Sequence, residues 1–406
     1  MIRWCTGIVS EIIGHGIDRA LQEIRVQLDQ PILIEAQSAQ EYPVSAKAIH
    51  YTSHMPSLRL GDRVLLNTTA VDLQLGSGGY HYVYKVLNRI EELLDPKKKF
   101  HAKGHMMKLR YTPQQHAFFA VEEEESPYHT VFSVEQNLDG IPVLIGELHS
   151  MLPILLCRFR YLFEERRKQS RKNGSPMVED YPRISYIMSD GGALPLAYSN
   201  HVEMLQNLKW IEGTVTYGQA FGGDLEAMNK FTALIAARHV QKADIIIVIM
   251  GPGIAGTGTL LGHSGVEAGE IINAASILGG VPVMIPRISF AEARGRHYGL
   301  SHHTTNSLSK IALKKAILPL PQDLPLNFRS ILEQQVQAFM YDSSIVSHEI
   351  RWIKGLTPAS VHASHALYPL PITTMGRELN EDACYFQGVC AAAEFVWDYG
   401  VAWDHH

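Results

Sequence analysis

Residues 243–256 read ADIIIVIMGPGIAG, an apolar run that ends in a glycine-rich segment. The run Ile245–Met250 is bounded by polar and glycine residues, which predicts a buried strand. Apolar and small residues at helical spacing follow over Val266–Leu278, and a second apolar run follows at Val281–Ile285. This order of strand, loop, helix and strand predicts a right-handed crossover unit of a parallel sheet.

The same pattern extends towards the N-terminus. Three more apolar runs predict buried strands: Ile141–Ile145, Ile184–Met188 and Gly213–Thr216. Between residues 227 and 240, four apolar side chains lie on one stripe at helical spacing, which predicts an amphipathic helix. These four are Met228, Phe231, Leu234 and Ile235. We therefore expect a mostly parallel, Rossmann-like α/β sandwich over residues 129–320.

The first 90 residues follow a different pattern, in which short β-type runs alternate with turn signals such as Leu60-Gly61-Asp62. This pattern predicts a small β barrel or sandwich. The runs are Thr6–Ile13, Glu23–Leu28, Ile32–Ala36, Val44–Tyr51, Arg63–Asn67 and His81–Val86. We expect four parts: an N-terminal β domain (1–90), a linking β segment (91–128), the α/β domain (129–320), and a C-terminal helix with an irregular extension (321–406).

Composition narrows the class of protein. The 36 Lys and Arg residues against 41 Asp and Glu give a net charge of −5, which disfavours a nucleic-acid binder or a membrane-surface protein. The four cysteines are too scattered for a disulfide framework, so we expect reduced thiols and a cytoplasmic location. The first 18 residues lack the continuous apolar run of a secretion signal. The longest apolar stretch, 141–159, is interrupted by Glu147 and Pro153, so no membrane span is expected.

Polar or glycine-rich segments follow each of the five predicted strands. They are residues 146–150, 189–193, 217–224, 251–265 and 287–303. In an open parallel sheet, ligands bind beyond the carboxyl ends of the strands, where such loops meet. The connections expected at the opposite edge, such as residues 241–243, are short. The sequence therefore predicts one ligand site at one edge of the sheet.

The glycines after the strand at 245–250 fit the spacing G-x-G-x-x-G at Gly251, Gly253 and Gly256, which lets a backbone approach a pyrophosphate. The helical pattern, however, begins only after residue 263, and no acidic residue follows at the position expected for a ribose contact. A loop that cradles another phosphate or a carboxylate is thus favoured over a dinucleotide site, and glycines that merely shape a tight connection are the alternative. Thr257 stands where a Walker-type NTPase needs lysine.

Three arginines and three histidines share the loop after the last predicted strand: Arg287, Arg294, Arg296, His297, His302 and His303. Facing the start of a helix, they would form an anion-attracting wall. Because His302 and His303 are adjacent, an extended backbone would point them in different directions, so we expect at most one to contact a ligand. Alternatively, some of the six pair with carboxylates and have a structural role.

Acidic residues and two further histidines could supply metal ligands or a general acid and base: Glu147, Asp190, Asp224, Glu226, Glu267, His149 and His263. None has a diagnostic ligand spacing, so no metal site is predicted. We assign Asp190, Asp224 and His302 as candidate catalytic residues. The candidate ligand-binding residues are Gly251, Gly253, Gly256, Thr257, Gly258, Thr259, Arg287, Arg296, His297, His303 and Gln219. Ser150 and Ser189 lack the G-x-S-x-G setting of a hydrolase nucleophile.

Several long segments of the chain resemble an uncharacterised bacterial family, domain of unknown function 3866. They are SDGGALPLA (189–197), GTVTYGQAFGGDLEA (213–227), MGPGIAGTGT (250–259), RISFA (287–291) and GLSHHT (299–304). The resemblance covers most of the chain and implies a bacterial cytosolic protein. It brings no activity and no catalytic residue to this sequence.

These observations predict an enzyme that binds an anionic small molecule, phosphate-bearing or nucleotide-like, and acts as a transferase or hydrolase. A non-catalytic metabolite sensor or scaffold is one alternative, and an NAD(P)-dependent oxidoreductase is another. No cofactor is identified from the sequence. The residues after 320 could cap the α/β domain or form the contact of a homo-oligomer.

Overall fold

The computed structural model describes residues 2–15, 20–30, 44–53, 55–75, 78–89, 104–173, 180–342 and 346–399. The chain forms two compact units, Met1–His101 and Ala102–His406. Among the described residues, the first unit has one hydrophobic cluster and the second has two.

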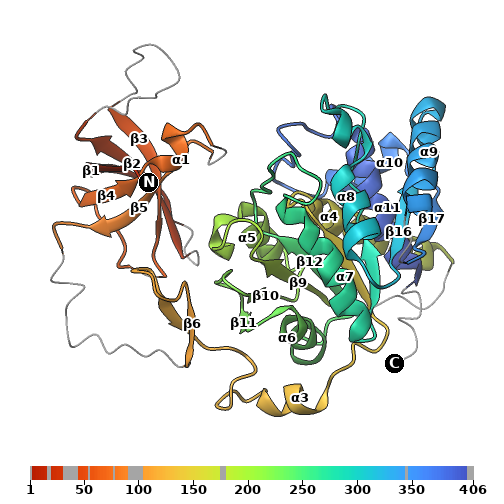
Figure 1. The fold of residues 1–406 in the computed structure, drawn as a ribbon, viewed down its shortest axis with the longest axis horizontal. Coiled ribbons are helices and arrows are strands. Elements are labelled where there is room, and N and C mark those ends of the chain that lie inside the picture. The colour runs from red at the N-terminus through yellow and green to blue at the C-terminus, as the bar shows by residue number, and fades with distance from the viewer. Residues whose placement is uncertain are drawn as a thin grey trace. The chain divides into compact units, whose positions relative to one another are not determined.

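The first unit is a closed five-stranded barrel, as the sequence predicted (Figure 1). Its strands are β1 (Trp4–His15), β2 (Leu21–Leu28), β3 (Ser45–Tyr51), β4 (Arg63–Asn67) and β5 (His81–Val86), in the order β1-β2-β3-β5-β4. The pairs are antiparallel except β3 with β5, which is parallel. Alternate residues such as Val64 and Leu66 point into the barrel and are fully buried. A short helix, α1 (Thr69–Asp72), follows β4. The expected strand Ile32–Ala36 lies outside the described residues.

The second unit is built on an eight-stranded sheet in which every neighbouring pair is parallel. Its strands are β8 (Pro142–Gly146), β9 (Ile184–Ser189), β10 (Gly213–Tyr217), β11 (Leu225–Ala227), β12 (Ile245–Met250), β13 (Val281–Met284), β16 (Ile317–Pro321) and β17 (Glu349–Ile353). Their order across the sheet is β11-β10-β9-β12-β8-β13-β16-β17. This confirms the predicted Rossmann-like α/β fold.

Helices cover both faces of this sheet (Figure 1). One face is packed by α4 (Met151–Asn173), α5 (Asn200–Asn207), α10 (Pro358–His365) and α11 (Ala383–Tyr399). The other is packed by α6 (Lys230–Ile235), α7 (Glu267–Ile277) and α9 (Leu326–Asp342), while the polar helix α8 (His302–Asn306) adds no residue to that core. Strand β12 shows why its sequence is apolar throughout. Ile245, Ile247 and Ile249 belong to the first layer's core, while Ile246 and Val248 belong to the second.

Short elements complete the second unit. They are β6 (Met106–Lys108), β7 (His116–Phe118), α3 (His129–Val134), η1 (Leu196–Tyr198), η2 (Ala236–Val240), η3 (Ser264–Val266), β14 (Ile288–Ser289), η4 (Gly295–His297), β15 (Gly299–Leu300) and η5 (Ser307–Ile311). Strands β6 and β7 form an antiparallel pair, as do β14 and β15. Of the helices in the described residues, none combines the length and apolar character needed to cross a membrane.

Two regions differ from the expectations. The C-terminal region is more regular than expected, since it supplies strand β17 to the sheet and the helix α11, most of which is buried. The stripe expected over residues 227–240 is only half buried. Leu234 and Ile235 belong to the core, but Met228 and Phe231 are exposed, because Asn229 caps the helix and starts it at Lys230.

The strand order places a topological switch point beside the central strand β8. From β8 the chain continues into α4 on one face of the sheet, whereas from β12 it continues into α7 on the other face. Loops that leave neighbouring parallel strands towards opposite faces separate from one another and leave room for a ligand at the carboxyl edge. The residues that follow β8, β12 and β13 are therefore the first to consider for function.

Candidate functional site

Four histidines gather beyond the carboxyl ends of these strands: His263, His297, His302 and His303, which we call the histidine cluster. The ring centroids of His302 and His303 lie 4.4 Å apart, and His297 lies 4.7 Å and 4.8 Å from these two rings. The ring of His263 stacks on that of His303 at 3.7 Å with an interplanar angle of 4°. The cluster unites the loop after β12 with the loop after β13.

The expectation that at most one of His302 and His303 contacts a ligand assumed an extended backbone, and that assumption was wrong. Both residues begin the helix α8 rather than lying in an extended segment, and Ser301 caps that helix by accepting a hydrogen bond from the backbone N–H of His303. Successive helical side chains differ in direction by about 100°, not by the half-turn of a strand. Their two rings can therefore lie side by side.

Glu147, the residue that follows β8, is fully buried next to the cluster. Its Oε2 lies 3.0 Å from Nδ1 of His303, and its Oε1 accepts a hydrogen bond from the hydroxyl of Thr304 at 3.3 Å. Arg287 is also buried and places Nη1 3.3 Å from the same Nδ1. Burial opposes ionisation of Glu147, but the contact with His303 and the charge of Arg287 outweigh burial and hold the pKa of Glu147 below its usual value.

Burial keeps three members of the cluster uncharged at neutral pH. Burial and the neighbouring His303 lower the pKa values of His263 and His302 to about 4. Burial and the charge of Arg287 lower the pKa of His297 to about 3. Neutral imidazoles offer a lone pair on one ring nitrogen, so these side chains can accept hydrogen bonds or bind a metal ion.

The glycine-rich loop after β12 contributes to the site differently from what its spacing suggests. Residues Gly256 and His263 form an antiparallel bridge, and the backbone N–H of Thr257 donates to the carbonyl of Gly262 at 2.7 Å. This small hairpin lies between the glycines and helix α7, so the loop does not form the short turn into a helix that holds a pyrophosphate. Instead the hairpin presents His263 to the cluster.

The individual loop residues fall into two groups. Gly251 is buried, and a Cβ built there would lie 2.2 Å from the carbonyl oxygen of Ala193, so this glycine serves packing. Gly253, Gly256 and Gly258 are exposed, as are Thr257 and Thr259. The hydroxyl of Thr257 bonds to that of Thr259 at 3.0 Å and to the Gly262 carbonyl at 3.0 Å, which keeps both hydroxyls within the loop.

The arginine- and histidine-rich loop reaches the glycine-rich loop. A Cβ built on Gly258 would lie 3.8 Å from Nη1 of Arg296, so Arg296, which is exposed, brings a positive charge to that turn. Arg294 instead pairs with Glu292 at 2.8 Å. The loop is also braced by the paired strands β14 and β15.

Two of the remaining predicted residues lie at the same edge of the sheet but outside the cluster. Asp190 follows β9, and its Oδ2 accepts a hydrogen bond from the backbone N–H of Gln219 at 2.9 Å. The side chain of Gln219 is itself engaged, since its Oε1 accepts from the backbone N–H of Leu109 at 2.7 Å. This pair connects the loops after β9 and β10 and is separate from the histidine cluster.

Asp224 is not brought to the carboxyl edge. Its Oδ2 accepts hydrogen bonds from the backbone N–H of Thr214 at 2.8 Å and from the Thr214 hydroxyl at 2.9 Å. Thr214 is the second residue of β10, so Asp224 lies towards the amino end of that strand. There it closes the connection between β10 and β11, which is a structural role.

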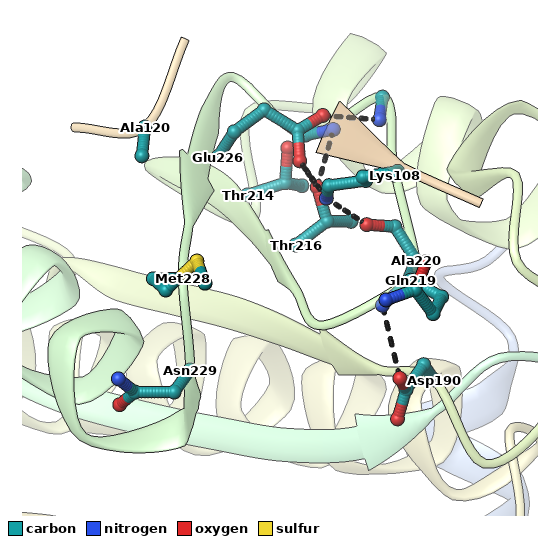
Figure 2. Close-up of polar contacts among 12 residues, drawn as sticks. Lys108, Ala120, Asp190, Thr214, Thr216, Gln219, Ala220, Glu226, Met228 and Asn229 are labelled. Atoms are coloured by element: carbon teal, nitrogen blue, oxygen red, sulfur yellow. Dashed lines mark hydrogen bonds and ion pairs between the residues drawn. The ribbon is translucent and has the colours of Figure 1, made fainter. Parts of the chain in front are cut away.

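A buried lysine that sequence reasoning missed lies beside the edge strand β11 of the sheet (Figure 2). The side chain of Lys108 is fully buried, and its Nζ donates to Oε2 of Glu226 at 2.5 Å and to the carbonyl of Ala220. Glu226 also accepts from the hydroxyl of Thr216 at 2.8 Å. Burial lowers the pKa of Lys108, while Glu226 opposes that shift. With two of its three N–H donors engaged, Lys108 attaches strand β6 to the sheet.

Other polar residues near the edge are also paired internally. His149 places Nε2 2.6 Å from the hydroxyl of Ser199, and Ser150 bonds to the hydroxyl of Tyr385 at 2.8 Å. Ser189 donates to Glu267 at 2.7 Å. The histidine cluster with Glu147, Arg287 and Arg296 is therefore the candidate site. Each of these residues was named as a candidate from the sequence, but their mutual contacts were not predicted.

No curated protein matches this sequence. A family model described as a protein of unknown function, DUF3866, matches residues 47–393. The matched region includes every residue of the candidate site and most of the chain. The chain therefore belongs to the DUF3866 family of proteins of unknown function.

Proposed function

We propose that this protein is an enzyme that binds an anionic small molecule, phosphate-bearing or nucleotide-like, at the switch point beside β8. One observation carries the proposal. Arg287 and Arg296 bring two positive charges to the histidine cluster, and the buried carboxylate of Glu147 contacts the same cluster. Guanidinium groups bind phosphate and carboxylate through charge-assisted hydrogen bonds. The uncharged histidines can accept or relay protons from a bound substrate.

Arg296 is the residue expected to reach a ligand first, because it is exposed beside the turn at Gly258. Arg287 is buried against His303, so we expect it to act on a ligand through its positive charge rather than through direct contact. The proposal includes a cytoplasmic location, which is supported by the four free cysteines. A homo-oligomer stays a prediction.

Calorimetric titration with nucleotides, sugar phosphates and inorganic phosphate tests the proposal. We expect submillimolar binding of at least one phosphate-bearing compound, weakened about tenfold or more by Arg296→Gln. Arg351→Gln removes the same charge from an exposed position on strand β17 and is the matched control. An absence of binding up to the millimolar range would refute the proposal.

The two alternatives give different results in the same experiment. A compound that binds and is recovered unchanged after long incubation would favour a metabolite sensor over an enzyme. Tight binding of a pyridine dinucleotide would favour an oxidoreductase. The hairpin between Gly256 and His263 makes that second result unexpected, because it separates the glycines from the helix.

A further inference from the structure

Three histidines of the cluster present nitrogen atoms to one another. His263, His302 and His303 each offer a ring nitrogen, and these three atoms lie within 4.8 Å of one another. Three imidazole nitrogens bound to one zinc ion at 2.0–2.1 Å lie about 3.3 Å apart in a tetrahedral arrangement. The rings of His263 and His303 are stacked, so a small change in their relative tilt would let one nitrogen of each ring bind the same ion.

Several of these nitrogens are buried and lack a hydrogen bond. Among the described residues, Nε2 of His302 and both ring nitrogens of His263 have no hydrogen bond of full geometry, although the backbone of Leu260 approaches the His263 ring and favours its charged form. The side chain of His263 is deeply buried, with the residue only 6 % exposed. A buried polar atom without a partner costs about 1–3 kcal/mol. Three such atoms in one cluster indicate a ligand that binds nitrogen.

Neighbouring groups orient two of the rings as metal ligands are usually oriented. The Glu147 carboxylate and the Arg287 guanidinium both lie against Nδ1 of His303, at 3.0 Å and 3.3 Å, so Nε2 is the nitrogen of that ring left for an ion. The side-chain amide of Asn306 lies 3.2 Å from Nδ1 of His302. An amide can donate or accept at that position, so Nε2 is the nitrogen of His302 that stays open.

We infer that His263, His302 and His303 hold one divalent transition-metal ion of the zinc type. Three imidazoles without a thiolate suit zinc and neighbouring first-row ions, whereas magnesium and calcium prefer oxygen ligands. Three protein ligands leave a fourth position open to water or to an anionic group. The role of that position in chemistry rests on the proposed function, but binding of the ion does not.

The test uses the full-length protein, stripped with a chelator, and zinc or cobalt chloride alone. We expect one ion per chain, a rise in melting temperature with zinc, and the visible absorption of tetrahedral Co²⁺. His302→Gln should weaken zinc binding about 100-fold or more, and Glu147→Gln about tenfold. His362→Gln, on the exposed side of α10, is the matched control and should bind zinc like the wild type.

Circular dichroism of each variant separates lost binding from lost folding. If His263→Gln fails to fold, His302→Gln still decides the question, because His302 is only half-buried. Zinc binding that is unchanged in a folded His302→Gln variant, or no tighter than at scattered surface sites, would overturn the inference. Retained zinc binding without phosphate binding would refute the proposed function alone, and retained phosphate binding without zinc would refute this inference alone.

Discussion

Lys108 shows how one buried charge can hold a peripheral strand to a sheet. Its amine contacts Glu226 and Ala220, and it lies 4.5 Å above the ring of Phe118. Removing one partner of a buried pair leaves the other uncompensated, which costs more than the pair contributes. The cost of removing one partner of the Lys108–Glu226 pair can therefore be predicted and measured without any ligand.

Lys108→Met should lower the free energy of unfolding by about 3 kcal/mol, because it leaves the Glu226 carboxylate without its positively charged partner. The double variant with Glu226→Gln should recover part of that loss. Urea unfolding measures both, and Lys310→Met at an exposed position is the control. Equal losses for Lys108→Met and Lys310→Met would contradict a structural role for the pair.

His149 gives a prediction about pH. Burial lowers its pKa to about 4, with a further contribution from His201, against the usual 6.5. Above pH 6.5 both the folded and unfolded states are uncharged at this residue, so stability is unaffected. As pH falls from 6.5 towards 4, the unfolded state takes up the proton first, and the folded state loses stability.

Unfolding free energies at pH 7, 6 and 5 should therefore decrease, and His149→Gln should show a shallower decrease. Other buried histidines such as His50 and His348 contribute in the same direction, so the variant should reduce the slope rather than abolish it. A slope identical to that of the wild type would show that His149 is protonated in both states alike.

At the scale of elements, the loops after β9 and β12 pack backbone against backbone. A Cβ on Gly192 would lie 2.1 Å from the carbonyl oxygen of Gly251, and the N–H of Ala193 donates to the carbonyl of Pro252 at 2.8 Å. Gly253, by contrast, has open space around it but a φ of +100°. The two glycines are therefore required for different reasons.

The same substitution should separate these reasons. Gly192→Ala should cost about 3 kcal/mol through overpacking of the two loops. Gly253→Ala should cost about 1 kcal/mol, because only backbone strain opposes it. Thermal unfolding ranks the two variants. The opposite ranking would mean that the loops separate easily and that the conformation of Gly253 is the stronger constraint.

The sequence was sufficient to predict the strands that are buried on both faces. The predicted runs at 184–188 and 245–250 coincide with β9 and β12 within a residue. Strand β16 was missed because Pro319 and Pro321 interrupt its pattern, and β11 because it has only three residues at the sheet edge. Neither β16 nor β11 shows alternating buried and exposed residues, so both strands can be recognised only from their pairing with neighbouring strands.

The candidate site was predicted in composition but not in geometry. Strand ends bring Glu147 and Arg287 to one edge, which parallel topology implies. That Asp224 lies towards the amino end of β10 follows from a hydrogen bond to Thr214, which lies ten residues earlier in the chain. The contact between His263 and His303 depends on a hairpin without a recognisable sequence signature and on a helix start whose only signature is the N-cap Ser301, which is weak by itself.

At the scale of the whole molecule, the hydrophobic clusters predict how the chain can be divided. The cluster of the first unit is drawn from residues such as Val9 and Val86, and those of the second from residues such as Val121 and Trp397. Since each unit buries its own apolar residues, each should be stable without the other.

Residues 102–406 expressed alone should therefore unfold in one cooperative transition. In separate titrations the fragment should bind zinc and phosphate as tightly as the full chain does. Limited proteolysis of the full chain should cut within 97–103, a segment that lies outside the described residues. A fragment that is unfolded by circular dichroism would show that the second unit depends on the first. Resistance to protease throughout 97–103 would show that the two units are packed as one body.

The position of β8 at the centre of the sheet has a consequence for synthesis on the ribosome. Val143 pairs with Ile246 on one side and with Pro282 on the other, so the first strand of the sheet to emerge receives its neighbours long afterwards. Pairings that are distant in the chain form slowly. The nascent second unit must therefore keep its most apolar segments from aggregating until residues beyond Met284 have left the exit tunnel, whereas the barrel can close while translation is still under way.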